Sequence, residues 1–184
     1  MIHDSCFVSA GFTVLELLIT VAIIGVLASI ILASVSTSRA RASDKKILED
    51  LNTVRNEAQL YLDSAGSFGP NTANAKCSAG GVSATLFADM TNPSTGSTNP
   101  HIAKINSAIA SANAESGGSV NVNGKYSNTR CVNSPTTWAI AVRLKEDTTS
   151  SWCVDSNNVS KKVSGDASAA FTFPVAAGFG SLCQ

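Results

Sequence analysis

Hydrophobic side chains form one unbroken block near the start of the chain. The run FTVLELLITVAIIGVLASIILASVS covers residues 12–36, contains no proline and has one glycine in its middle, Gly25. It exceeds the ~20 apolar residues that a helix needs to cross the hydrocarbon core of a bilayer. Glu16 is the only formally charged residue between Phe12 and Ser38. The pattern predicts a membrane-spanning helix with one acidic residue near its beginning.

After residue 38 the pattern changes to a single apolar stripe. Apolar residues then recur at steps of four, three, four and three, at Ile47, Leu51, Val54, Ala58 and Tyr61. This spacing places them on one face of a helix that must be buried. No glycine or proline occurs between residues 39 and 64, and Gly66 is a suitable stop. We therefore predict one helix from Phe12 to about Asp63, with an apolar half (12–38) and an amphipathic half (39–64).

The rest of the chain, residues 65–184, is expected to form a globular head. Its first part, residues 66–118, is rich in Ser, Asn, Thr, Gly and Ala, which predicts a long connection. One short helix is expected within it. That helix begins at Asn99-Pro100 and places three isoleucines on one face, Ile102, Ile105 and Ile109.

The last third of the chain favours β-structure. Asn123-Gly124 is a strong hairpin turn, and residues 136–145 alternate apolar and polar positions. SSWCVDS and, near the C-terminus, AFTFPV are further strand candidates. We expect an antiparallel sheet of three or four strands, with one face against the helix and the other toward solvent. The fold class is therefore α+β.

Charge and motifs argue against catalysis and against nucleic-acid binding. Thirteen basic and thirteen acidic residues cancel, and no basic stripe is present. The sequence has no GxSxG, HExxH or Walker loop. We interpret His101 as a surface residue because no carboxylate or nucleophile accompanies it, and VDSNNVS as an Asx-rich turn in preference to a calcium loop. No enzyme activity, cofactor or metal is expected.

The segment GFTVLE resembles the processing site of type IV prepilins. In that family a membrane peptidase cuts after the glycine and methylates the new N-terminal residue, which map to Gly11 and Phe12. The family's invariant glutamate maps to Glu16, and residues 1–11 become the leader. Two features depart from the pattern: the leader has no lysine or arginine, and Arg39, Arg41, Lys45 and Lys46 follow the span, against the positive-inside tendency.

The resemblance gives the isolated carboxylate a role. An ionised group at the centre of a spanning helix costs about 2.5 to 3.5 kcal/mol, and less near the interface. Cleavage would create a compensating positive charge, the α-ammonium group of Phe12. In a staggered stack of parallel helices, Glu16 of one subunit would pair with that ammonium in its neighbour and fix the axial register. The alternative is an interfacial residue at the end of a signal anchor.

Without Cys6, which the leader would remove, four cysteines remain: Cys77, Cys131, Cys153 and Cys183. An even number suits two disulfides in an oxidising compartment, and four cysteines allow three pairings. We favour Cys77 with Cys131 and Cys153 with Cys183. Free thiols are the alternative.

Together the resemblance implies a type IV pilin fold, a long helix packed on a small antiparallel head, and a subunit of an extracellular helical fibre. WCVDS after a strand ending in Leu-Lys also resembles the pilin head. The implied partners are other copies of the chain, a prepilin peptidase, a platform protein and assembly ATPases. The chain would lie in the cytoplasmic membrane before assembly and in the pilus afterwards, with adhesion, twitching or DNA uptake left open. The alternatives are a type II secretion pseudopilin, whose Asp-Pro-Trp-Gly segment is missing here, and a signal-anchored surface module.

Overall fold

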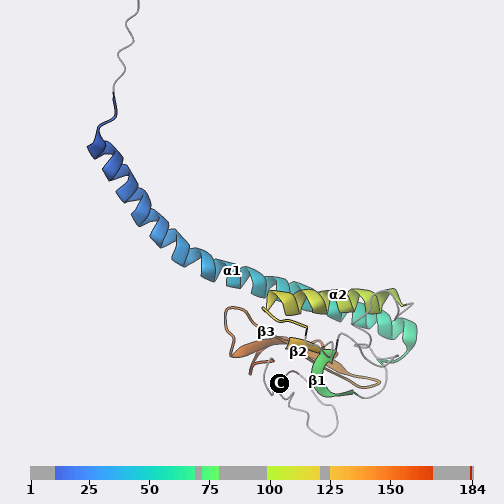
Figure 1. Cartoon of the computed structure of the whole chain (residues 1–184). Helices are drawn as coiled ribbons and strands as arrows, with labels where there is room; N and C mark the ends of the chain where they lie inside the picture. The colour runs from blue at the N-terminus through green and yellow to red at the C-terminus, as the bar shows by residue number, and fades with distance from the viewer. Residues whose placement is uncertain (1–10, 69–71, 79–98, 121–124, 168–182, 184) are drawn as a thin grey trace, which may run out of the picture. The chain divides into compact units, whose positions relative to one another are not determined.

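The computed structural model describes residues 11–68, 72–78, 99–120, 125–167 and 183 (Figure 1). Its elements are two helices, α1 (Val14–Ala65) and α2 (Pro100–Glu115), and five strands, β1 (Thr72–Ser78), β2 (Lys125–Asn133), β3 (Trp138–Arg143), β4 (Ser150–Asp155) and β5 (Ser160–Ser164). The chain divides into two compact units, one up to Arg39 and one from Ala40 onward. The predicted α+β class, with a long N-terminal helix and a small antiparallel sheet, is confirmed.

Helix α1 follows the predicted change of pattern. It runs without interruption for 52 residues and ends where Gly66 adopts a positive φ of 73°. The Gly66 N–H donates to the Leu62 carbonyl at 2.7 Å, which satisfies one carbonyl of the last turn. All five stripe residues are buried, namely Ile47, Leu51, Val54, Ala58 and Tyr61. The amphipathic interpretation of this half is confirmed.

Helix α2 begins where the sequence predicts. The Asn99 side chain accepts a hydrogen bond from the His101 N–H at 2.9 Å, and Pro100 occupies the first helical position. The three predicted isoleucines are buried in the core shared with α1 and the sheet, at Ile102, Ile105 and Ile109. Figure 1 shows α2 lying along the C-terminal part of α1.

The sheet is antiparallel throughout, in the order β1-β2-β3-β4-β5. The described residues therefore form five strands, where three or four were expected. Neither additional strand has the large apolar or aromatic residues that identify a strand in sequence: the apolar positions of β1, TANAKCS, are alanine and cysteine, and β5 reads SKKVS with one buried residue, Val163. Lys161 and Lys162 of β5 are exposed. Both are edge strands, whose side chains need less burial than those of central strands.

One face of the sheet packs on the helices through Trp138, Ile140, Val142 and Val154. The expectation that the opposite face would meet solvent is wrong. Ala139, Ala141, Cys153 and Val163 form a second buried cluster there, together with Cys183. A disulfide to Cys153 holds Cys183 within this cluster.

Several predictions fall on other parts of the chain. The Asn123-Gly124 turn, the AFTFPV strand and the first ten residues of the expected leader lie outside the described residues. They stay predictions.

Candidate functional site

The first turn of α1 holds the residues that the sequence singled out. Gly11 and Phe12 precede the helix, and Glu16 lies in its first turn. The Thr13 N–H and hydroxyl donate to Glu16 Oε2 at 2.9 and 2.8 Å, and the Glu16 N–H donates to Thr13 Oγ1 at 3.3 Å. This reciprocal arrangement is a capping box, in which two otherwise unpaired N–H groups at the helix start are satisfied.

Sequence reasoning missed the role of Thr13. The signal was available, because a threonine followed three residues later by glutamate, just before an apolar run, is the usual pattern of a capping box. The consequence is that the Glu16 carboxylate is held at the beginning of the helix, four residues from Phe12. In the described chain its hydrogen-bond partners are within its own first turn.

Beyond this turn, α1 presents apolar side chains on all sides. The large side chains from Phe12 to Val35 that the structure describes are all exposed, by 80% at Phe12 and 37% at Val35. They are Phe12, Val14, Leu15, Leu17, Leu18, Ile19, Val21, Ile23, Ile24, Val26, Leu27, Ile30, Ile31 and Val35. By length and composition, α1 is the one helix among the described residues that meets the requirements for crossing a membrane.

The four cysteines of the head form two disulfides in the favoured pairing. Cys77 on β1 is bonded to Cys131 on β2, with their Cα atoms 5.0 Å apart. Cys153 on β4 is bonded to Cys183, with a Cα separation of 5.7 Å. The first cross-links an edge strand to its neighbour, and the second fixes the end of the chain to the sheet.

Helices α1 and α2 are also joined by a polar cluster. Glu57 Oε2 lies 2.7 Å from His101 Nδ1, and Glu57 Oε1 lies 2.9 Å from Lys104 Nζ. Burial alone would raise the pKa of Glu57, but the hydrogen bonds from His101 and Lys104 outweigh it and hold that pKa below its usual value. The premise that no carboxylate accompanies His101 is therefore wrong. Its partner is 44 residues away in sequence, and the contact is an interhelical hydrogen bond.

The VDSNNVS segment forms an Asx-rich turn, as its composition predicts. Asp155 is fully buried, and its Oδ1 accepts hydrogen bonds from the N–H groups of Asn157 and Val159 at 2.9 and 3.0 Å. Its Oδ2 accepts from the Cys183 N–H at 3.2 Å. The carboxylate is thus used to hold the hairpin and the C-terminus together. Among the residues that the structure describes, no group of three His, Cys, Asp or Glu side chains is placed to hold a metal ion.

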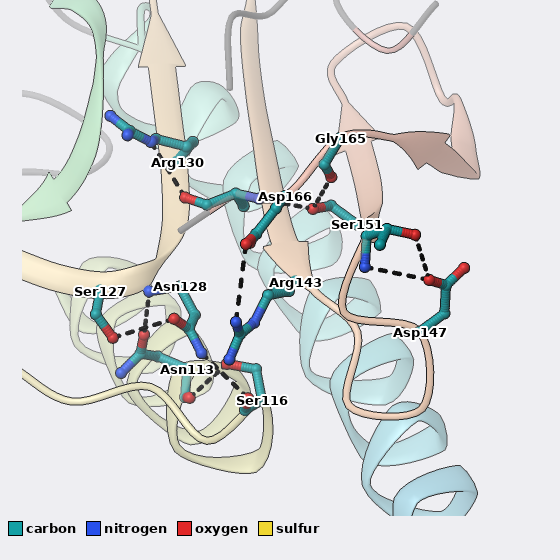
Figure 2. Close-up of polar contacts among 12 residues, drawn as sticks. Asn113, Ser116, Ser127, Asn128, Arg130, Arg143, Asp147, Ser151, Gly165 and Asp166 are labelled. Atoms are coloured by element: carbon teal, nitrogen blue, oxygen red, sulfur yellow. Dashed lines mark hydrogen bonds and ion pairs between the residues drawn. The ribbon is translucent and has the colours of Figure 1, made fainter. Parts of the chain in front are cut away.

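A further polar network fixes the end of α2 against the sheet (Figure 2). The Asn128 N–H donates to Asn113 Oδ1 at 3.1 Å, the Asn128 side chain donates to the Ser116 carbonyl at 3.1 Å, and the Ser116 hydroxyl donates to the Asn113 carbonyl at 2.6 Å. Gly118 is needed here, because a Cβ at this position would clash with the Asn113 side chain.

The segment after β5 is held by neighbouring strands (Figure 2). Ser151 Oγ donates to the Gly165 carbonyl at 2.7 Å and accepts from the Ala167 N–H at 3.0 Å. Arg130 Nε donates to the Ala167 carbonyl at 3.2 Å. These bonds tie residues 165–167 to two different strands, so they stabilise the fold and do not form a reactive arrangement.

Comparison with protein-family models, with curated proteins and with solved structures finds no match to this chain. The functional argument therefore depends on the residues themselves. One feature remains without a structural explanation within the described chain: the exposed apolar surface of α1. The carboxylate at its start has a local role as a helix cap, which does not by itself require a charged side chain.

Proposed function

We propose that this chain is the structural subunit of an extracellular fibre of the type IV pilus kind. It is stored in the cytoplasmic membrane through the apolar half of α1, is cleaved between Gly11 and Phe12, and assembles with other copies by helix packing. The single observation that carries the proposal is the apolar surface of α1, on which every described large side chain from Phe12 to Val35 is exposed.

Such a surface must be covered by lipid or by protein. Exposed apolar patches on soluble monomers rarely exceed a few hundred Å², and a helix that is apolar on all sides belongs in a bilayer or in a protein core. A bilayer meets this need before assembly, and parallel copies of the same helix meet it in a fibre. Exchange between the two environments leaves the apolar surface buried at each stage.

The position of Glu16 supports the fibre over a simple anchor. In a simple anchor the Glu16 side chain would serve only as a helix cap, which an uncharged glutamine also provides, while partial burial of its charge in the bilayer is unfavourable. In a fibre the same carboxylate offers a partner to the Phe12 ammonium group that cleavage creates in a neighbouring subunit. Only one axial offset pairs the two charges, whereas Leu, Ile and Val side chains tolerate many offsets. Cohesion thus comes from the apolar surface and register from the ion pair.

The head is suited to an exposed position outside the cell. Two disulfides cross-link it, which requires an oxidising compartment. The partners that follow from the resemblance are a prepilin peptidase, a platform protein and assembly ATPases. The proposed role is structural, without catalysis and without specific nucleic-acid binding.

The N-terminus of the mature protein tests the proposal directly. Mass spectrometry of filaments sheared from the cell surface is expected to find a chain beginning at N-methylated Phe12. A chain that retains Met1 and stays in the membrane fraction would indicate a signal-anchored surface module. A chain that begins at Phe12 but never leaves the cell envelope would indicate a secretion pseudopilin. Either result contradicts the proposal.

Matched variants at the capping box separate register from helix stability. Glu16→Gln keeps the capping hydrogen bonds, since glutamine also serves at this position, but removes the charge. Thr13→Ala removes the cap, at about 1 kcal/mol of helix stability, and keeps the charge. We expect filaments to be lost or greatly reduced in Glu16→Gln and retained in Thr13→Ala, as seen by electron microscopy at equal membrane levels of the subunit. The opposite result would mean that Glu16 acts only as a cap.

A further inference from the structure

A groove of about 520 Å³ lies within the second unit, between the beginning of its part of α1 and the turn that joins β3 to β4. Leu48, Leu144 and Trp152 contribute apolar surface to it. Trp152 is half-buried, and its indole N–H is already used, donating to Ser160 Oγ at 3.1 Å. The groove therefore offers a partly exposed aromatic ring whose polar atom is satisfied.

The acidic residues that line the groove already have partners. The Asp44 carboxylate accepts hydrogen bonds from the N–H groups of Lys145 and Glu146. Glu146 is paired with Arg41. Asp147 is paired with Lys162 at 2.6 Å, and hydrogen bonds from that lysine and from Thr149 and Ser150 hold the pKa of Asp147 well below its usual range. These carboxylates act as fixed parts of the turn.

Two cationic side chains of the groove can still bind a ligand. Lys45 lines the groove and has no hydrogen bond or ion pair with any residue that the structure describes. Arg41 uses Nε for Glu146 at 2.8 Å, and its side chain is still 68% exposed. Such cationic groups bind the anionic oxygens of a phosphodiester more strongly than they bind a neutral ligand.

The sequence places these cations next to the apolar run. Arg41 and Lys45 follow Ser36 by five and nine residues in the same helix. The polar layer of a bilayer is about 5 to 7 Å thick on each side, and long basic side chains extend along a helix to reach it. Residues 39–46 carry four basic residues and one acidic residue.

From these observations we infer that the groove binds the head group of an anionic phospholipid while the chain is stored in the membrane. The phosphodiester oxygens accept hydrogen bonds from Lys45 and Arg41, and the glycerol portion lies on Trp152 and Leu48. Aromatic rings with a satisfied polar atom are favoured at this depth of a bilayer. A free phosphate ion has no apolar portion that could pack on Trp152 and Leu48. The inference depends on the membrane-stored stage of the proposed function and adds a lipid ligand to it.

Lipid binding by the full chain in a mild non-ionic detergent tests the inference. Native mass spectrometry would be used to titrate the protein with phosphatidylglycerol, phosphatidylcholine or inorganic phosphate. We expect one retained phosphatidylglycerol, with Lys45→Gln weakening its binding roughly fivefold, the usual contribution of one basic residue near an anionic surface. Lys161→Gln is the matched control, because Lys161 is an equally exposed lysine of the same unit that does not line the groove.

A second readout uses the two tryptophans. Trp138 is buried and Trp152 is not, so phosphatidylglycerol is expected to shift the emission of the wild type and to leave Trp152→Phe unchanged. Equal binding of both lipids, equal binding by Lys45→Gln, or displacement by inorganic phosphate at the lipid concentration would overturn the inference. Those results would not affect the proposed function, which is tested separately by the N-terminal residue of the mature chain and by the presence of filaments.

Discussion

The disulfide between β1 and β2 gives the most quantitative test of the head. Cys77 and Cys131 are separated by 54 residues, so the cross-link closes a long loop in the unfolded chain. The chain-entropy relation for a loop of this length gives about 4 kcal/mol of stabilisation at 25 °C. Domains are usually stable by only about 5 to 15 kcal/mol. Cys77→Ala/Cys131→Ala is therefore expected to remove a large part of the stability of the head.

Urea unfolding of the full chain in mild detergent measures this loss. The emission of Trp138 reports it, because this side chain is buried and its ring contacts Phe68 edge-on at a centroid distance of 6.5 Å. The dependence of the unfolding free energy on urea should also steepen, since an unfolded chain without the cross-link exposes more surface. Cys6→Ala is the control for the loss of a thiol outside the head. A loss below about 1 kcal/mol, or alkylation of Cys77 in the untreated protein, would refute the reasoning.

Three further predictions concern packing, the end of α1 and pH. Ile105→Ala removes a fully buried side chain and is expected to cost about 2 to 5 kcal/mol in the same assay. Gly66→Ala places a Cβ on a residue with φ of 73° and should cost about 1 to 2 kcal/mol, seen as a lower thermal midpoint. Folding lowers the pKa of Glu57, so this carboxylate contributes to the free energy of unfolding above its ordinary pKa of 4.5, and the contribution is lost as the pH falls from there through the lower pKa of the folded state. Glu57→Gln should abolish this part of the acid dependence, measured as unfolding free energy against pH.

Local periodicity predicted the helices well. The change from an apolar run to an apolar stripe gave both halves of α1, and Asn99-Pro100 gave the start of α2, because each signal depends on residues within a few turns of one another. The strands β1 and β5 escaped prediction for the same reason. Their side chains are mostly polar, and pairing with a neighbouring strand, which no local pattern records, makes them part of the sheet.

Long-range contacts explain the other differences. The second buried face of the sheet includes Cys183, which is 30 residues from its disulfide partner Cys153. The contacts of Glu57 with His101 and Lys104 depend on how α2 packs on α1, although one sign was present: these two residues are three apart and so lie on the same side of a helix. The capping box at Thr13 and Glu16, by contrast, depends only on residues three apart, so it could have been predicted from the sequence.

The lysines of β5 have a consequence for self-association. β5 is the last strand of the sheet, and an open strand edge invites a second sheet to add to it. Lys161 is exposed on that strand, where two such edges brought together would set its charge against that of its copy, whereas Lys162 is already paired with Asp147. The charge on this strand therefore disfavours edge-to-edge stacking of two sheets, whereas the apolar half of α1 carries no such protection along its exposed surface.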